Sequence, residues 1–138
     1  MKKRILIAAF VGGLVTFAIV ATALGSSSRT GASPLPSSSC GKLQYSGSGS
    51  PDYIIASDLP LQGANRALTT EMNKAIAYML GQQGWKAGSH TVGFQACDDS
   101  TAQKGSWDSS KCTSNANAYA QNKAVMAVIG TFNSGCAA

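Results

Sequence analysis

Three apolar stretches alternate with two stretches of helical spacing along residues 52–138. The short run Tyr53–Ala56 is β-rich, and Pro60 follows closely enough to end a strand. The segment His90–Ala96 predicts a second, less hydrophobic strand. Ala124–Gly130 is continuously apolar, which is typical of a parallel strand covered on both faces. We therefore expect three strands in this part of the chain.

The segment between the first two strands carries a helical pattern. Its apolar residues recur at every fourth position and form one face of a 3.6-residue period. Asn65 suits the N-cap of this helix, and Gly81 or Gly84 suits its C-terminal stop. The apolar face consists of Leu68, Met72, Ile76 and Leu80.

A second helix is expected over Thr113–Asn122, which is rich in alanine and asparagine. Its inward-facing residues should be Ala116, Tyr119 and Ala120. The long polar stretch that precedes it, Asp98–Lys111, predicts an insertion between the second strand and this helix.

The resulting order is β-α-β-α-β, and crossovers of this length join parallel strands in a right-handed sense. The predicted fold class is therefore α/β, a three-layer Rossmann-like parallel sheet. Ligands of such sheets bind beyond the carboxyl ends of the strands, near the point where the strand order reverses. Any site should be built from the three loops that lie there, namely Ser57–Gln62, Cys97–Ser100 and Thr131–Cys136.

The first 51 residues have a different character. Residues 1–25 combine a basic cluster with an apolar run, which predicts a cleaved export signal or a retained membrane anchor. Residues 26–51 are rich in Ser, Gly and Pro and predict a flexible linker. Cys40 follows three serines and leaves lipidation as a further means of attachment. The folded domain should occupy residues 52–138, in an extracytoplasmic compartment, and meet the membrane only through the N-terminal segment.

Charge and cysteine content restrict the partners of the chain. Three of the eleven Lys and Arg lie in the signal, so the remaining eight oppose six acidic residues and leave a net charge of +2. These basic residues are dispersed, which argues against a nucleic-acid partner. Four cysteines in an exported chain predict disulfides, with three possible pairings. Zinc would favour close Cys pairs with several histidines, whereas His90 is the only histidine.

Three segments resemble the opening of type I periplasmic solute-binding proteins, in the group related to branched-chain amino acid (Leu/Ile/Val) receptors. Ile55–Gly63 follows strand one, where that family has its first binding-side loop. Gly93–Ser100 is similar to the family's acidic turn after strand two. Val128–Ser134 is similar to the end of strand three, where a glycine precedes a Ser-rich ligand loop. The resemblance covers residues 52–138 in the right order and spacing.

The resemblance implies a non-catalytic receptor that delivers an amino acid or similar small polar solute to an ABC importer permease, without cofactor or metal. It assigns ligand binding to Ser134, with Asn133 and Gln62 on the same rim. Without the family, the sequence Asn-Ser-Gly would be read only as a turn. Members of the family have two lobes that close by hinge motion. The second lobe is absent here, so we expect a truncated N-terminal part of the first lobe.

Two disulfide pairings compete. A Cys97–Cys112 bridge would close a loop of about 14 residues around the polar insertion and restrain the unfolded chain by roughly 3 kcal/mol. It is the pairing we expect. The resemblance implies a different bridge, from Cys97 to Cys136, which would join two strand ends. Cys40 would then pair with the remaining cysteine or stay free.

Other residue groups favour structural interpretations. Asp98 and Asp99 offer oxygens to a hard cation, but adjacent acids at a strand end more often stabilise a turn. His90 begins a strand, on the side opposite the predicted site, which argues against a role as a general base. Trp107 suits either a lid or a packing anchor. Nucleotide-binding and hydrolase motifs are absent, so we expect no enzyme.

An alternative function comes from a different class of protein. A small disulfide-stapled cell-surface module would work by protein contact and would bind no solute. The open apolar edge left after the last strand could pair with another chain, as exposed strands tend to do.

Overall fold

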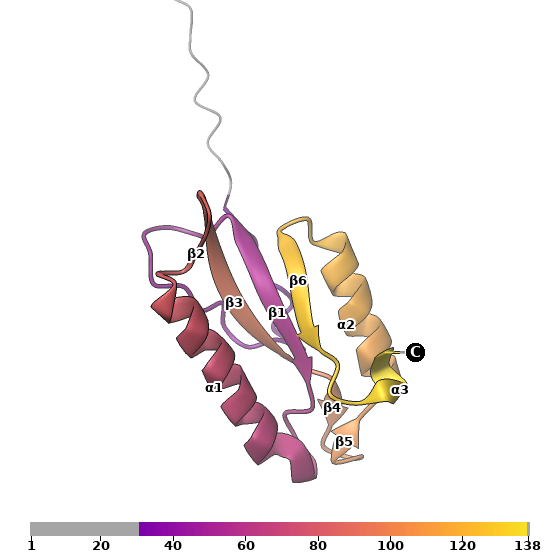
Figure 1. Cartoon of the computed structure of the whole chain (residues 1–138). Helices are drawn as coiled ribbons and strands as arrows, with labels where there is room; N and C mark the ends of the chain where they lie inside the picture. The colour runs from indigo at the N-terminus through magenta and orange to yellow at the C-terminus, as the bar shows by residue number, and fades with distance from the viewer. Residues whose placement is uncertain (1–30, 138) are drawn as a thin grey trace, which may run out of the picture.

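One four-stranded sheet is built around the central strand β1 (Tyr53–Leu59) in the computed structural model, which describes residues 31–137. β3 (His90–Asp98) pairs with one side of β1 and β6 (Val125–Gly130) with the other, both in parallel. β2 (Lys86–Ala87) pairs antiparallel with β3, so the strand order is β2-β3-β1-β6. The protein is thus a mixed α/β fold with a mostly parallel sheet, and the three predicted strands are confirmed (Figure 1).

Helices cover both faces of this sheet. The remaining elements are η1 (Gly63–Asn65), α1 (Arg66–Gln82), β4 (Ser100–Thr101), β5 (Ser106–Trp107), α2 (Ser109–Gln121) and α3 (Ser134–Ala137). Ser57 Oγ donates to Asn73 Oδ1 of α1 at 2.6 Å, whereas Asp58 Oδ1 accepts from Asn115 Nδ2 of α2 at 2.8 Å. Neighbouring residues of a strand point to opposite faces. The helices α1 and α2 therefore pack on opposite sides of β1 (Figure 1).

The first helix, α1, begins and ends where its caps were predicted, and Met72, Ile76 and Leu80 of the predicted apolar face are partly buried, but the most buried residues lie beside that face. Thr69 and Asn73 are buried, whereas Leu68 of the predicted apolar face is 57% exposed. Thr69 Oγ1 donates to Pro60 O at 2.6 Å and so ties the helix to the end of β1. Hydrogen bonds to buried polar groups, which the apolar pattern cannot reveal, set the rotation of this helix.

The second helix, α2, begins four residues before the predicted start. The Asp108 carboxylate accepts hydrogen bonds from the backbone amides of Ser110 and Lys111, at 3.0 and 3.1 Å, and acts as the N-cap. The polar insertion is correspondingly shorter and contains the β4–β5 hairpin.

The inward face of α2 also differs from the prediction. Cys112 and Asn115 are buried, whereas Ala116 and Ala120 are exposed. Only Tyr119 of the three predicted residues packs against the core. The inward face is set by one disulfide and by polar contacts to β1, so alanine content was a poor guide to it.

The segment 31–51, which was predicted to belong to a flexible linker, packs on the sheet instead. Ala32, Leu35 and Cys40 are buried and join the core cluster of β1. Residues 39–44 run antiparallel along the outer edge of β3, with Gln44 N donating to Phe94 O at 2.8 Å. Composition suggested that this stretch could not bury apolar surface, but a few apolar residues suffice when backbone hydrogen bonds and a disulfide hold it.

A single side chain secures much of this segment. Gln95 of β3 is buried, and its Oε1 accepts from Leu35 N at 2.7 Å. Its Nε2 donates to Leu35 O at 3.1 Å and to Gly41 O at 2.8 Å. The side chain thereby satisfies backbone groups of a loop that would otherwise be buried unpaired. Gly93, two residues earlier, leaves room for the segment, because a Cβ there would lie 2.8 Å from Leu43 Cδ1.

The last strand, β6, was predicted to be covered on both faces, and this is wrong. Met126, Val128 and Ile129 are 53%, 39% and 40% exposed. β6 lies at the edge of the sheet, and among the described residues no strand pairs with its outer side. A continuous apolar run identified a parallel strand correctly, but it did not reveal that this strand lies at the edge of the described sheet.

Within residues 31–137, no helix is both long enough and apolar enough to cross a membrane. The signal or anchor predicted for residues 1–25 and the start of the predicted linker lie outside the described range. The described structure contains two disulfides. Disulfides form and persist in oxidising compartments outside the cytosol.

Candidate functional site

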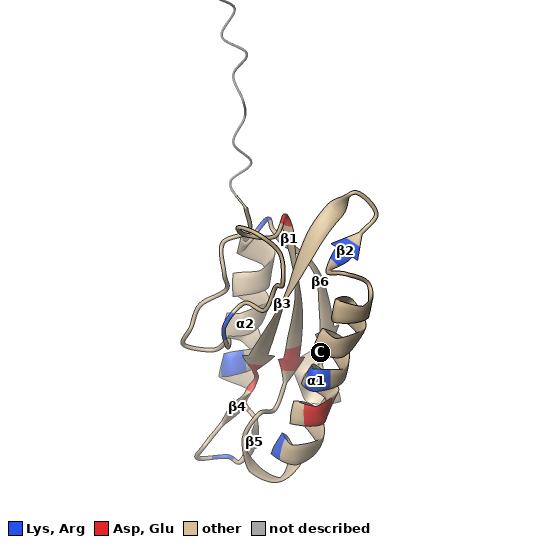
Figure 2. Ribbon diagram, turned by 90° about the vertical axis from the view of Figure 1, so that its left-hand side faces the viewer, with Lys and Arg blue, Asp and Glu red and all other residues tan. Residues whose placement is uncertain are grey.

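The loops that follow β1 and β3 meet at the carboxyl ends of these strands, where Figure 2 shows a group of acidic residues. Leu61 N donates to Asp98 Oδ1 at 2.9 Å, and Gln62 N donates to Ser100 Oγ at the same distance. Asp98 Oδ1 also accepts from the amide and hydroxyl of Ser100. Asp98 is therefore the residue that joins the first two loops.

Gln62, predicted to contact a ligand, is occupied within the protein. Its Nε2 donates to Asp98 Oδ2 at 2.7 Å and to Ser100 O at 3.1 Å. Both contacts bind the β1 loop to the β3 loop. The side chain thus stabilises the rim of the site.

The charge of Asp98 is well compensated. Burial alone would raise its pKa, but hydrogen bonds from Ser100, Leu61 and Gln62 hold the pKa below its usual value. Lys111 Nζ lies 3.4 Å from Asp98 Oδ2 and donates to Ser100 O at 3.0 Å. Asp98 is therefore an ionised structural residue, in agreement with the interpretation as a stabilised turn.

A second carboxylate, Asp58, lies at the end of β1 and faces α2. Asn115 Nδ2 and Tyr119 Oη donate to its Oδ1 at 2.8 and 2.9 Å. Burial raises the pKa of Asp58, and these two hydrogen bonds partly offset the rise. Burial and the adjacent Asp58 charge likewise raise the pKa of the Tyr119 hydroxyl, which keeps it protonated as a donor.

The third carboxylate, Asp99, is poorly satisfied. It is fully buried, and its Oδ1 has no hydrogen-bond partner within the described part of the chain. Its Oδ2 lies 3.5 Å from Cys136 Sγ, which has no proton to donate because it belongs to a disulfide. Burial, followed by the charges of Asp58 and Asp98, raises the pKa of Asp99 to about 6. Within residues 31–137, Oδ1 of Asp99 is thus a buried acceptor without a donor.

The turn after β6 carries the other two predicted ligand residues. Ser134 is exposed at the first position of α3. Asn133 is half-buried, and its Nδ2 is a buried donor with no partner among residues 31–137. Cys136 N donates to Asn133 O at 3.0 Å and closes the turn. Ser134 and Asn133 therefore lie together, while no hydrogen bond in the described structure joins them to Gln62.

Two disulfides connect other pairs of cysteines than we expected. Cys40 bonds to Cys97, and Cys112 bonds to Cys136. The Cys97–Cys112 bridge predicted from the polar insertion is wrong, and so is the Cys97–Cys136 bridge implied by the family resemblance. Cys40 lies directly opposite Cys97 across the antiparallel edge of β3, with 3.9 Å between their Cα atoms. Because the Cys40 sulfur is bonded to Cys97, it is not free to carry a lipid.

The Cys112–Cys136 disulfide ties the turn after β6 to the first turn of α2. The turn also contacts Trp107 of β5, whose ring occupies the space that a side chain at Gly135 would need. Trp107 therefore acts as a packing anchor for the turn. Together these contacts fix the position at which Ser134 is presented.

Asp99, Cys112 and Cys136 place three potential metal-ligand atoms within 4.8 Å of one another. Both sulfur atoms are engaged in the disulfide, and the thiolate form is the metal ligand. The group therefore does not suit a metal while the disulfide is intact. His90 lies at the other end of the sheet, where its Nδ1 is 3.9 Å from Asp52 Oδ2.

Asp58, Asn115 and Tyr119 were not predicted as site residues, although Tyr119 was expected to face inward and Asp58 lies in a predicted site loop. Asp58 ends the sequence Ile-Ile-Ala-Ser-Asp, so an acid after a buried strand was a usable signal. Asn115 and Tyr119 are four residues apart in the predicted helix and share one face. A reading that gave polar residues the same weight as apolar ones could have paired them with a strand-end acid.

Comparisons of the chain with known protein families, with curated proteins and with solved structures gave no match.

Proposed function

We propose that the chain is the N-terminal part of the first lobe of a type I solute receptor, which captures a small polar solute, such as an amino acid, for an ABC importer permease. The proposed lobe is a three-layer Rossmann-like sheet. Its support is the parallel order β3-β1-β6, in which the chain leaves β1 toward one side and then crosses to the other. Ligands of open α/β sheets bind outside the carboxyl ends at such a reversal.

The observation that carries this proposal is the pair of unsatisfied polar atoms at that end of the sheet. Asp99 Oδ1 is a buried acceptor and Asn133 Nδ2 a buried donor, and neither has a partner in the described structure. Buried polar groups normally have partners, so each exception calls for an explanation. A solute with both a cationic and an anionic group could supply a donor to Asp99 and an acceptor to Asn133. Exposed Ser134 adds a hydroxyl that can donate or accept.

The exposed edge strand β6 supports the proposal that the chain forms only part of a lobe. Its exposed apolar residues and free outer side suit a further parallel strand with its helix, and a second lobe would cover the solute from the other side. A half-site of this kind cannot bury a small ligand well. Function as a receptor therefore requires additional α/β units and a second lobe.

Calorimetric titration with a panel of amino acids tests the solute class. The protein to use is the polypeptide in which this segment is joined to a second lobe. Ser134→Ala should weaken binding of the preferred amino acid at least about tenfold, because a hydrogen bond to a charged group is lost. Ser114→Ala, which changes an exposed serine of α2, should leave the affinity unchanged. Failure of the parent protein to bind any amino acid would refute the solute class.

A second candidate, a disulfide-stapled cell-surface interaction module, is favoured by the same exposed strand. β6 carries no charged residue or proline, the features that usually protect an exposed edge from pairing. This function predicts a stable homo-oligomer in light scattering. Met126→Lys places a charge at an exposed position of β6 and should dissociate the oligomer. Thr113→Lys places the same charge at an exposed position of α2 and should leave the oligomer intact. A parent protein that stays monomeric at high concentration would exclude homo-oligomerisation through β6.

A further inference from the structure

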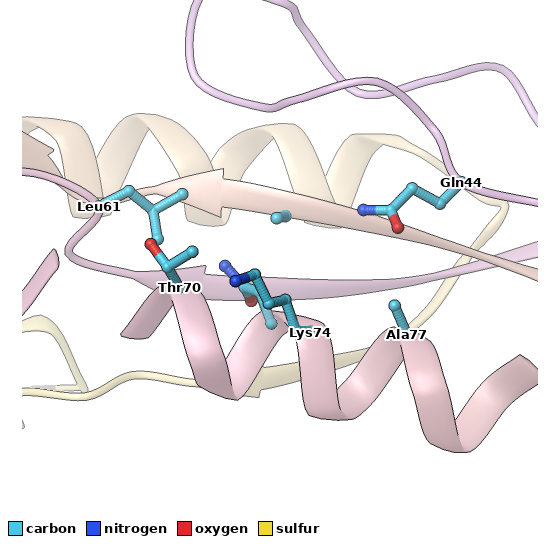
Figure 3. Close-up of a pocket in the computed structure, with 7 residues that line it drawn as sticks. Gln44, Leu61, Thr70, Lys74 and Ala77 are labelled. Carbon is cyan, nitrogen blue, oxygen red and sulfur yellow. The ribbon is translucent and has the colours of Figure 1, made fainter. Parts of the chain in front are cut away.

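A groove of about 410 Å³ runs along α1, on the face of the sheet that α1 covers (Figure 3). Leu61 lines one end and Gln44 the other. Ala77 of α1 and Ala96 of β3 contribute small apolar surfaces between them. We call this feature the α1 groove. Gln44 belongs to the segment that packs along β3, so this segment contributes one end of the groove.

Three polar side chains in the α1 groove have hydrogen-bonding capacity left over. Asn73 is 8% exposed, and its Oδ1 accepts from Ser57, but its Nδ2 has no acceptor among the described residues. The Thr70 hydroxyl and the Gln44 side-chain amide likewise have no partner there. Each of these groups can donate a hydrogen bond. The groove therefore offers several donors whose acceptors the chain itself does not provide.

The charged residue of the groove is Lys74. Its Nζ lies 2.7 Å from Glu71 Oε1, one turn earlier on α1, and both side chains are 67% exposed. An exposed ion pair of this kind contributes little free energy. An anion that reached the groove could therefore replace Glu71 beside Lys74, because breaking the Lys74–Glu71 ion pair loses little free energy.

We propose that the α1 groove is a binding site for a small carboxylate. Lys74 Nζ and Asn73 Nδ2 would hold the carboxylate oxygens, and the Thr70 hydroxyl and Gln44 amide would bind the rest of the solute. Hydrogen bonds in which one partner is charged are stronger than those between two neutral groups. No acidic side chain lines the groove, which disfavours an amine. The site lies along α1 and uses neither Ser134 nor Asn133, so it does not depend on the proposed receptor function.

Titration of the ¹⁵N-labelled full chain with succinate, followed by NMR, tests the site at its contacts. The side-chain amide signals of Asn73 and Gln44 should shift and saturate with succinate. They should not respond to succinamide, which has the same length but no charge. Absence of a saturable succinate shift, or an equal response to both compounds, would overturn the proposal.

Two exposed substitutions should change the succinate affinity in opposite directions. Lys74→Gln removes the cation and should weaken binding about threefold, as expected for an exposed ion pair. Glu71→Gln releases Lys74 from its internal partner and should strengthen binding about threefold. Lys86→Gln on β2 is the matched control and should have no effect. If Lys74→Gln and Glu71→Gln both leave the affinity at the parent value, or both weaken binding, carboxylate recognition by Lys74 is wrong.

Discussion

Replacing Cys40 and Cys97 together with alanine should lower the free energy of unfolding by about 4 kcal/mol. The disulfide joins residues 57 positions apart, and cross-linking so distant a pair removes much conformational entropy from the unfolded chain. It also holds the segment 31–51 against the core formed with β1. Changing both cysteines avoids leaving a free thiol. Urea unfolding followed by circular dichroism measures the loss.

The matched control is the double alanine variant of Cys112 and Cys136. That disulfide spans 24 positions, so the same entropic relation gives a smaller loss of about 3.5 kcal/mol. The Cys40–Cys97 variant should in addition make the buried residues Ala32 and Leu35 more accessible, because hydrogen bonds alone then hold their segment to β3. An unchanged unfolding midpoint in the Cys40–Cys97 variant would mean that the bridge does not stabilise the fold.

Asp99→Asn should stabilise the protein at pH 7.5 by about 2 kcal/mol and have little effect at pH 4. The pKa of Asp99 is raised from 3.8 to about 6 in the folded protein, so the folded state binds its proton more tightly than the unfolded state. Stability from this group is fully present below pH 3.8 and is lost as the pH rises through 6. The full shift corresponds to about 3 kcal/mol, which screening by nearby water reduces.

The measurement is the difference in unfolding free energy between parent and variant across this pH range. The charged groups that face Asp99 are Asp58, Asp98 and Lys111, and they remain in both proteins, so their own titration largely cancels in the difference. The variant that removes a well-satisfied carboxylate, Asp98→Asn, should instead destabilise the protein at neutral pH. If the difference in unfolding free energy between the parent and Asp99→Asn stays constant from pH 4 to 7.5, the pKa of Asp99 is not raised by folding.

The strand and helix order could be predicted because the apolar runs and the helical spacing are local properties. Rotation of the helices could not, because it depends on polar partners far away in sequence. Thr69 faces inward to reach Pro60 O, and Asn115 faces inward to reach Asp58. Both contacts satisfy buried polar atoms, which an apolar periodicity does not register.

The parallel topology predicted that the loops at the carboxyl ends of the strands lie together, and the loops after β1 and β3 do meet there. The disulfide pairs were not predictable, because Cys40 lies in a stretch whose composition resembled that of a linker. Its backbone pairing with β3 brings Cys40 opposite Cys97. The full burial of Asp99 was equally hidden, since nothing in the sequence distinguishes it from the partly buried, well hydrogen-bonded Asp98.

The two edges of the sheet are unequal, and this difference limits how copies of the chain could associate. On the β3 side, the edge is occupied by β2 and by residues 39–44, which are short and fixed by a disulfide. In the described structure β6 is the edge strand of this sheet that is longer than two residues, so it is the edge suited to strand pairing. A continuous fibril needs two open edges on each subunit, whereas one open edge closes the assembly at a two-fold pair. Edge-to-edge association should therefore stop at the dimer.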